Sequence, residues 1–439
     1  MIFGIGFENP SLVGLICVGV LFALVLLGVR VVFAAAISGM LGLIELLGWG
    51  PAAGIVGTIP HSKSASYELS VLPLFIFIGF LAYHAGLTQQ LFEAARRWLG
   101  WLPGGMAVAT VMATAGFAAV SGASTATSAV FARVAIPEML KYGYDRKLAA
   151  GVVAAGGTLA SLIPPSAILV IYAIIVEESV GKLLLAGFLP GFLSAVVYGL
   201  IIVIWALRKP EQAPAVPASN WNERLRSLPG VSPIFLVVAI IMVSMFTGIA
   251  TPTEAGALGA SVVFVLALVR GTRARTISKA LLESAKLSAM IFSLIWGVMI
   301  FVRLLGFTGL PEAFTGWITS IDAPPLVIMI CILLGYAVLG MFMDAIGMMI
   351  LTLPVVYPAV MALGYDSVWF GIIVVKMAEV CLITPPIGLN CFVVNGVRPD
   401  ISLGDVFRGI TLFFVADVVT IALLLAFPEI VTWLPGLMR

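Results

Sequence analysis

The sequence contains few charged residues. Only 10% of its 439 residues are Asp, Glu, Lys or Arg, whereas a soluble domain carries about 25%. Hydrophobic residues make up 62%, and the mean hydropathy is +1.17. Apolar runs near the ~20 residues that a helix needs to cross a bilayer recur along the chain, without the alternation typical of a membrane barrel. These features predict an all-α polytopic membrane protein.

Several chemical signatures are also missing. The four cysteines are scattered and the two histidines lie apart from any cysteine or carboxylate cluster, so neither a disulfide framework nor a structural metal site is expected. No GxxxxGK[ST] loop is present, which argues against a nucleotide-driven pump. Without HExxH or GxSxG, an intramembrane enzyme using Asp344, Glu379 or Ser124 is the weaker hypothesis. The near-zero net charge gives no indication of a nucleic-acid partner.

The placement of the charges predicts a topology. Basic residues fall in clusters, which the positive-inside rule assigns to the cytoplasm, and most other connections are neutral or acidic. The first residues lack a basic region and a cleavage site, so no removable signal peptide is expected. Both termini are then predicted to be periplasmic. The predicted spans are 11–29, 31–49, 70–87, 148–176 and 183–207, followed by 233–250, 255–269, 283–303, 368–396 and 406–427.

Two stretches do not fit as ordinary spans. Residues 104–140 have basic residues at both ends and residues 325–362 begin and end outside, so each is predicted to be a re-entrant hairpin. Spans 148–176 and 368–396 contain the double prolines Pro164-Pro165 and Pro385-Pro386, which interrupt a helix. The polar stretch 208–232 is interpreted as a cytoplasmic linker between a first half, 1–207, and a second half, 233–439. Residues 89–101 are interpreted as an interfacial amphipathic helix or a cytoplasmic connector.

The two halves share a pattern of rare residues. Gly143-Tyr144-Asp145 and Gly364-Tyr365-Asp366 each precede a double proline by 21 residues, so an offset of 221 superimposes both motifs. Gly86-Leu87-Thr88 matches Gly306-Phe307-Thr308 at an offset of 220. With the predicted topology, the halves are inverted repeats. Paired broken helices in inverted repeats are typical of secondary transporters, whose sites lie at the repeat interface, although a proline alone often only kinks a helix.

The candidate site residues lie near these breaks. The stretch 121–128 is rich in hydroxyls and has Gly122 at its turn, which suits a hard cation or an anion, although small-residue packing explains part of it. At the matching position the second half has an intramembrane carboxylate, Asp344. Lys376 and Glu379 are interpreted as a structural or gating pair rather than ligands. The candidate substrate ligands are Thr125, Ser166, Asn390 and Asn395, with helix–helix hydrogen bonding as the alternative for the two asparagines.

Several segments together resemble a known family. GASTATSAVF, LASLIPPSAILVIY, TPTEAGALGA, MDAIGMMILTLPVVYPAV and EVCLITPPIGLNCFVVNGV are similar to the large membrane (M) subunit of tripartite ATP-independent periplasmic transporters over essentially the whole chain. The resemblance implies a Na⁺-driven symporter of the bacterial inner membrane with an elevator-like transport domain. It also implies a separate small four-helix (Q) subunit, and a periplasmic solute-binding (P) protein that delivers an organic acid, commonly a carboxylate.

The resemblance also implies two Na⁺ sites, so that two or more Na⁺ are expected to be co-transported. The first comprises Ser121 and Ser124, with Gly122 at the turn, and the carbonyls of Ala160, Ile163 and Pro164. The second comprises the hairpin from Gly340 to Ala345, including Asp344, and the carbonyls around Cys381, Thr384 and Pro385. The family usually has glycine where Ala160 and Cys381 stand. A stand-alone Na⁺/dicarboxylate symporter and a passive channel remain alternatives.

Overall fold

The computed structural model describes residues 9–438, except for the side chain of Glu68, and this part of the chain contains helices and no strand. The predicted all-α class is therefore confirmed, while the predicted position of the two termini falls partly on residues 1–8 and 439, outside the described residues. The elements are α1 (Pro10–Leu26), α2 (Val31–Leu47), α3 (Trp49–Ser64), η2 (Glu68–Ser70), α4 (Val71–His84), α5 (Leu87–Leu99), α6 (Gly105–Ser121), α7 (Ser124–Lys141), α8 (Arg146–Thr158), η3 (Leu159–Ser161), α9 (Ala167–Val176), α10 (Val180–Arg208), α11 (Trp221–Phe246), α12 (Pro252–Val269), α13 (Ala274–Thr308), α14 (Leu310–Thr319), α15 (Pro325–Gly340), α16 (Ala345–Ala362), α17 (Ser367–Ile383), α18 (Leu389–Val397), α19 (Leu403–Ala426) and α20 (Glu429–Gly436).

The helices follow the predicted segments with a few differences. The stretch 104–140 forms the consecutive helices α6 and α7, and 325–362 forms α15 and α16. Each double-proline segment is interrupted, between α8 and α9 and between α17 and α18. Helices α3, α14 and α20 lie in stretches where no span was predicted. The polar stretch 208–232 is only partly a linker, because α11 already begins at Trp221.

The repeated Gly-Tyr-Asp motif ends one helix and begins the next. Gly143 and Gly364 adopt φ of +80° and +86°, which glycine accommodates without steric cost. The following aspartates cap α8 and α17: Asp145 accepts from Lys147 N and Leu148 N, and Asp366 accepts from Trp369 N. This motif therefore sets the turn from each hairpin into the broken helix that follows it.

The sequence match at Gly86 is displaced in the structure. Gly86 adopts a left-handed conformation at the start of α5, where the chain bends by 70° between α4 and α5. Gly306 lies inside α13, and the left-handed glycine that precedes the next helix, α14, is Gly309. The offset of 220 therefore does not pair the two helix breaks.

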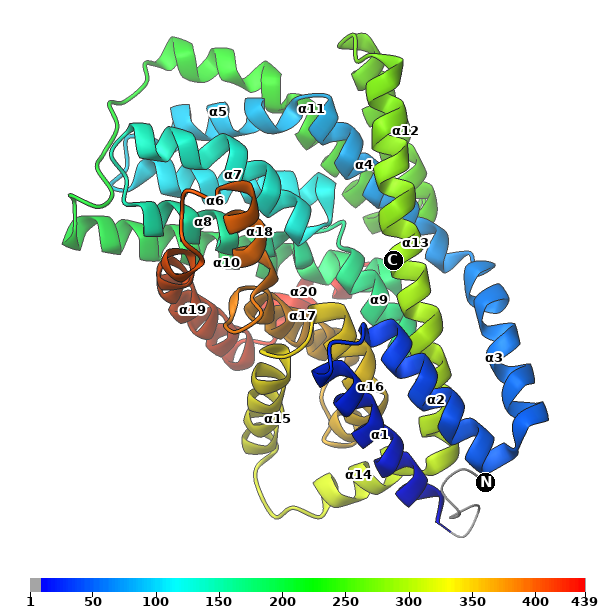
Figure 1. Ribbon diagram of the computed structural model, residues 1–439. Coiled ribbons are helices and arrows are strands. Elements are labelled where there is room, and N and C mark those ends of the chain that lie inside the picture. The colour runs from blue at the N-terminus through cyan, green and yellow to red at the C-terminus, as the bar shows by residue number, and fades with distance from the viewer. Residues whose placement is uncertain (1–8, 439) are drawn as a thin grey trace.

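The helices form two packed groups (Figure 1). In one group the long helix α13 packs against α2 and α4, and α12 packs against α4 and α11. In the other, α8 packs against α6, α7, α18 and α19, while α10 packs against α6 and α19. Helix α18 from the second half thus lies on α7 and α8 from the first, which interlocks the two halves.

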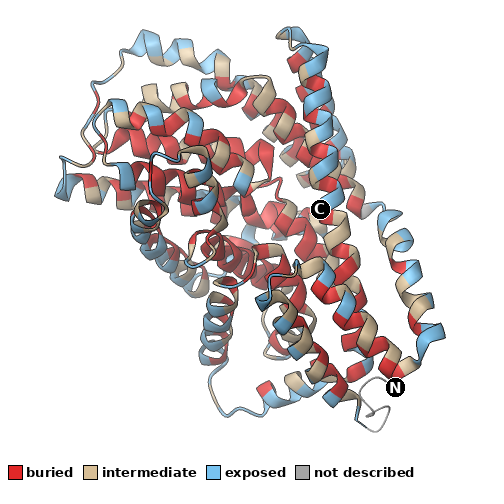
Figure 2. Ribbon diagram, in the orientation of Figure 1, coloured by how far each residue is buried: buried red, intermediate tan, exposed pale blue. Residues whose placement is uncertain are grey.

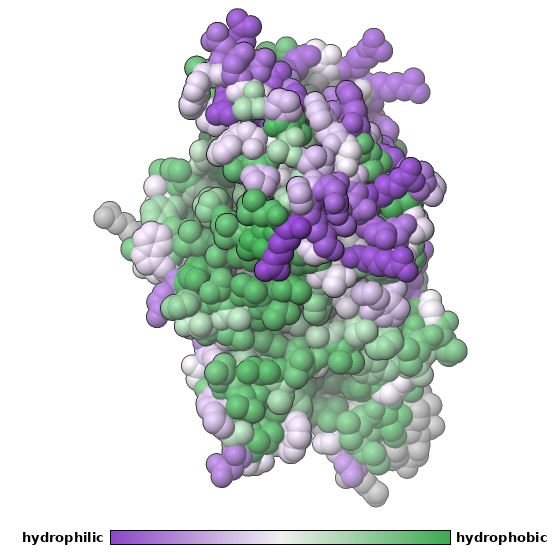
Figure 3. All heavy atoms as spheres, turned by 90° about the vertical axis from the view of Figure 1, so that its left-hand side faces the viewer, coloured by the Kyte–Doolittle hydropathy of each residue, from purple (hydrophilic) through white to green (hydrophobic). Residues whose placement is uncertain are grey.

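The first parts of the two broken helices occupy the core (Figure 2). Every residue of α8 from Leu148 onward and every residue of α17 from Val368 onward is buried. Six helices between residues 9 and 438 are long and apolar enough to cross a membrane, or seven if the bent α4–α5 pair counts as one. Figure 3 shows hydrophilic residues gathered toward the upper end of one side and hydrophobic residues covering its lower part. The chain is a multi-span helical membrane protein.

Candidate functional site

The first double proline lies beside the tip of the α6–α7 hairpin. The Pro164-Pro165 peptide bond is cis, and residues 161–166 are all buried. Gly122, at the turn between α6 and α7, has φ +60°, and a Cβ there would overlap the carbonyl oxygen of Pro165. A side chain at this position is therefore excluded both by conformation and by space.

Hydroxyl groups connect this hairpin tip to the break. Ser124 Oγ and Ser161 Oγ lie 2.6 Å apart, and Ser121 Oγ lies 2.9 Å from Thr127 Oγ1. Ser166 Oγ donates to the Ser161 carbonyl and accepts from Leu169 N at the start of α9. The structure thus brings Ser121 and Ser124 to the predicted break, and it adds Ser161 and Thr127 to the cluster.

Backbone oxygens are available at the same place. The carbonyls of Ile163 and Pro164 accept no hydrogen bond from any residue in 9–438. Carbonyl and hydroxyl oxygens are the ligands that hard cations prefer. Ala160 is buried in the short 3₁₀ turn η3, next to Ser161. The chemistry of this donor set is therefore suited to Na⁺.

The second break has a different environment. Pro385-Pro386 is also cis, but both prolines are exposed and Thr384 is half-buried. Thr384 Oγ1 donates to the Val380 carbonyl 2.6 Å away, so the hydroxyl is bonded within its own helix. Asp344 caps α16 by accepting from Gly347 N at 3.2 Å.

Close packing joins the second hairpin to α17. A Cβ on Gly340, at the end of α15, would overlap Cys381 Sγ on α17. Cys381 Sγ also lies 3.6 Å from Met348 Sδ on α16. The cysteine, where the family usually has glycine, is therefore accommodated by the missing side chain of Gly340.

None of the four predicted substrate ligands lines the cavity described below. Thr125 is exposed and Ser166 is part of the hydroxyl cluster. Asn390 is fully buried and donates to the Ala154 carbonyl at 3.1 Å, which ties α18 to α8. Asn395 donates to the Ile401 carbonyl at 2.8 Å. The alternative of helix–helix hydrogen bonding therefore describes the contact of Asn390, whereas Asn395 holds a local loop.

That loop contains a surface ion pair. Arg398 Nε and Nη2 donate to the two carboxylate oxygens of Asp400 at 2.8 and 2.7 Å. This guanidinium lowers the pKa of the Asp400 carboxyl to about 2. The pair lies outside the membrane-spanning segments and contributes to the turn between α18 and α19.

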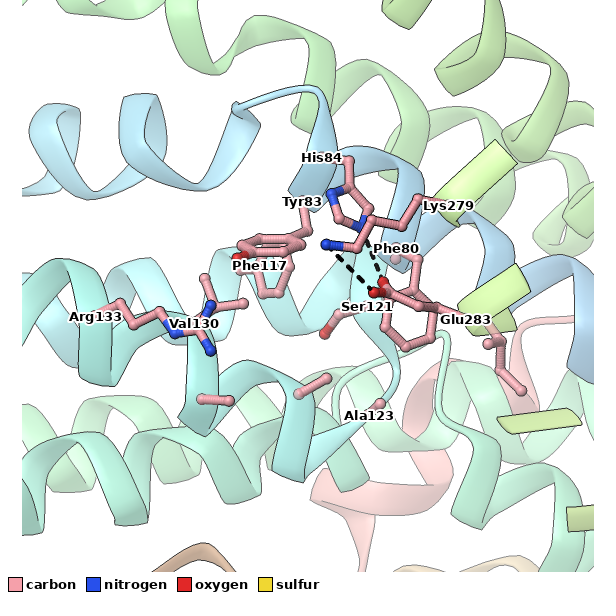
Figure 4. Close-up of a pocket in the computed structure, with 14 residues that line it drawn as sticks. Phe80, Tyr83, His84, Phe117, Ser121, Ala123, Val130, Arg133, Lys279 and Glu283 are labelled. Carbon is pink, nitrogen blue, oxygen red and sulfur yellow. Dashed lines mark hydrogen bonds and ion pairs between the residues drawn. The ribbon is translucent and has the colours of Figure 1, made fainter. Parts of the chain in front are cut away.

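A cavity of about 320 Å³ lies beside the tip of the first hairpin (Figure 4). Its walls come from α4, α6, α7 and α13 and include Ser121 and Ala123 at the tip. On one wall Glu283 accepts from His84 Nε2 at 2.8 Å and lies 3.9 Å from Lys279 Nζ. On another wall is Arg133, whose guanidinium has no ion-pair partner among the described residues. The cavity therefore combines apolar walls with an unpaired cation, which suits an organic anion.

A buried ionic network ties three helices together. Lys376 Nζ lies 2.7 Å from Glu379 Oε2 and 2.8 Å from Asp417 Oδ1, and all three side chains have zero exposure. Tyr198 on α10 donates to Asp417 Oδ1 at 2.6 Å. The predicted Lys376–Glu379 pair is present, and its contacts hold α17 against α10 and α19, consistent with a structural role.

Sequence reasoning missed Asp417, Tyr198, Arg133 and Ser161. Asp417 is a carboxylate inside the apolar run FFVADVVTIA, and this alone marks it as a candidate. Arg133 is likewise a charge within the first hairpin. Ser161 carries no comparable signal, because its partner Ser124 is 37 residues away.

Comparisons with known proteins agree on one family. Residues 18–430 match the model of the family described as tripartite ATP-independent periplasmic transporter, DctM component. The chain is 35% identical over 375 residues to the C4-dicarboxylate TRAP transporter large permease protein DctM of Pseudomonas aeruginosa, covering 85% of this chain and 86% of that protein. It is 30% identical over 344 residues to the isethionate TRAP transporter permease protein DctMQ of Oleidesulfovibrio alaskensis, covering 78% and 54%.

A solved structure agrees on the fold. The YdaH transporter of Alcanivorax borkumensis is similar with a TM-score of 0.58 over 97% of this chain and 100% of that chain. The sequence identity is 16%, so this likeness concerns the fold alone. The family match over most of the chain and the close relatives confirm the resemblance seen in the sequence. The chain therefore belongs to the DctM component family of tripartite ATP-independent periplasmic (TRAP) transporters, whose relatives include large permease proteins.

Proposed function

We propose that this chain is the large permease of a transporter that imports an organic acid across the inner membrane together with Na⁺. A periplasmic binding protein delivers the acid, and a small membrane subunit completes the permease. The family description names a tripartite periplasmic transporter, and one relative carries the combined name DctMQ. The observation that carries the proposal is the cavity beside the first hairpin, with Arg133 in its wall.

The charge of the cavity supports an acid as the substrate. Among residues 9–438 Arg133 has no acidic partner, whereas Glu283 is engaged by His84 and Lys279. A guanidinium binds a carboxylate or sulfonate through paired N–H donors. The relatives named for C4-dicarboxylate and isethionate are named for organic anions. We therefore assign Arg133 as the group that holds the acid in this cavity.

The hydroxyl and carbonyl oxygens at the two breaks supply the proposed Na⁺ sites. At the first break these are the hydroxyls of Ser121 and Ser124 and the carbonyls of Ile163 and Pro164. At the second break they are the backbone carbonyls around Cys381, Thr384 and Pro385. Each Na⁺ that moves inward gains about 2.3 kcal/mol per 100 mV of membrane potential. Two such ions, together with the Na⁺ concentration gradient, are sufficient to concentrate an anion against its own gradient.

The two packed groups suggest how access alternates. The group containing α2, α4, α11, α12 and α13 serves as the scaffold, and the hairpins with the broken helices form the moving body. Between them lie the cavity and the contact of Gly79 on α4 with the hairpin tip, where a Cβ would be 2.6 Å from Ser121 Cα. In this elevator scheme the hairpins and broken helices of the two inverted halves carry both ions and the acid across together.

Uptake by proteoliposomes tests the proposal. The chain is reconstituted with its small subunit and supplied with binding protein and labelled C4-dicarboxylate, isethionate or sialic acid. Replacing Arg133→Ala removes a charged hydrogen-bond partner, so the half-saturating acid concentration should rise about tenfold, and Arg133→Lys should restore part of the loss. The matched control is Arg275→Ala, which removes an exposed arginine outside the cavity.

Three results would contradict parts of the proposal. An unchanged half-saturating concentration in Arg133→Ala would exclude Arg133 as the ligand. Equal uptake without the binding protein would favour the stand-alone symporter. Uptake that is independent of the Na⁺ gradient would favour a passive channel.

A further inference from the structure

A second cleft, of about 410 Å³, lies between α8, α10 and α19, away from the hairpin cavity. Three basic residues line it: Lys147 on α8, Lys209 just after α10, and Arg408 on α19. They belong to three clusters that are far apart in the sequence, and all three clusters are assigned to the cytoplasmic side. The fold therefore brings positively charged side chains from both halves together at one place, which the predicted topology puts near the cytoplasmic membrane surface.

The charges in this cleft are only weakly neutralised. Lys147 Nζ and Arg408 Nη1 share one carboxylate oxygen of Asp405, at 3.9 and 3.7 Å. Both contacts are long and partly exposed, so they contribute little. The lining carboxylate, Asp145, already accepts two backbone N–H groups as the cap of α8. Lys209 has a cation–π contact, 4.4 Å from the Trp205 ring centroid, and no carboxylate partner between residues 9 and 438.

Apolar surface continues from this basic cleft. Leu148, Leu412 and Val415 line its wall. Beyond Val415, the residues Val418 and Val419 lie on the same face of α19 and are exposed. Trp205 also lines the cleft and donates through Nε1 to Gln212 Oε1 at 3.2 Å. Tryptophan is enriched at membrane–water interfaces.

We infer that this cleft binds the phosphate headgroup of an anionic phospholipid of the cytoplasmic leaflet. The three cations contact the phosphate, and the acyl chains lie along the exposed face of α19. Basic pockets between membrane helices on the cytoplasmic side are suited to such headgroups. A free phosphate ion shares the headgroup chemistry, but it gains nothing from the apolar face, so the lipid is the favoured occupant.

Lipid retention and thermal unfolding of the purified full chain, with its small subunit, test this site. Phosphatidylglycerol, phosphatidylcholine and inorganic phosphate are added separately to delipidated protein. We expect phosphatidylglycerol to remain bound in native mass spectrometry and to raise the unfolding temperature, with phosphatidylcholine weaker and phosphate without effect. The triple variant Lys147→Gln, Lys209→Gln, Arg408→Gln should lose this preference. Its matched control is Arg270→Gln, Arg273→Gln, Arg275→Gln, which removes the same charge from the connection between α12 and α13 and from the first turn of α13.

A single substitution keeps the test valid if the triple variant fails to fold. Lys209 is exposed and makes no ion pair in the described chain, so Lys209→Gln should fold and bind phosphatidylglycerol about fivefold more weakly. If both triple variants lost phosphatidylglycerol binding equally, or if neither lost it, the proposed site would be overturned. Stabilisation by inorganic phosphate equal to that by phosphatidylglycerol would overturn the lipid as its occupant.

Discussion

The two double prolines occur in nearly the same sequence setting but in different surroundings. Around Pro164-Pro165 the chain is buried, and the Ser124 and Ser161 hydroxyls connect the hairpin tip to the break, next to the Ser121–Thr127 pair within the hairpin. Around Pro385-Pro386 the chain is exposed, and the Thr384 hydroxyl is bonded to its own helix. The same backbone interruption thus occurs once in a closed, polar environment and once in an open one.

The side chains that surround the two breaks also differ. At the second break the hairpin contacts the broken helix through sulfur instead of hydroxyl groups, since Cys381 packs against Gly340 and Met348. After the first break Ser166 caps the next helix, whereas after the second the left-handed Gly388 does so. We therefore expect the first cation site to depend on side chains and the second to depend mainly on backbone carbonyls.

The largest effect is expected at the tip of the first hairpin. In Gly122→Ala the left-handed conformation costs roughly 1–2 kcal/mol, and the new methyl group overlaps the Pro165 carbonyl oxygen. Uptake should fall to background while the protein still inserts into the membrane. The control is Gly335→Ala in the second hairpin, where a Cβ meets nothing within 4 Å and uptake should be normal. Substantial uptake by Gly122→Ala would show that the tip does not need this close contact.

A smaller effect is expected at the second hairpin. Gly340→Ala places a methyl group against Cys381 Sγ, and such overpacking costs about 1–3 kcal/mol. The initial uptake rate should fall about tenfold, and the second substitution Cys381→Gly should restore most of it. Measured rates of the two single variants and the double variant test this pair. If the uptake rate of the double variant stayed as low as that of Gly340→Ala, Gly340 would act through something other than its contact with Cys381.

Local patterns were sufficient to predict much of the fold. The double prolines, the glycines and the capping aspartates act on neighbouring residues, so their positions in the sequence locate the breaks, the turns and the hairpins. Length and apolarity also mark α10, α11, α12, α13 and α19, which coincide with predicted spans, as candidate membrane helices among the described residues, while α16 is a further candidate within the second predicted hairpin. The helices α3 and α14 were missed because each is short and begins or ends in polar or proline-containing sequence.

The site could be predicted only in part. Ser121 and Ser124 are recognisable from a dense run of hydroxyls, but Ser161 becomes relevant only when α7 packs near η3. The cavity needs α13 beside the hairpin, which no local pattern in the sequence indicates. Asn390 stays a predicted substrate ligand, and its contact through Nδ2 with Ala154, which joins α18 to α8, is visible only in the structure. Long-range packing decides these contacts.

The Na⁺ concentration that gives half-maximal uptake, compared between Ser124→Ala and Thr384→Ala, tests the central claim most directly. Loss of one hydroxyl ligand costs about 1 kcal/mol, or about fivefold in affinity. Ser124→Ala should therefore raise this concentration about fivefold. Thr384→Ala should change it by less than about twofold, because the second site is expected to bind its cation mainly through backbone carbonyls, while Thr384 Oγ1 is bonded within its own helix. Equal shifts, or a larger shift in Thr384→Ala, would contradict the claim that the two breaks bind their cations differently.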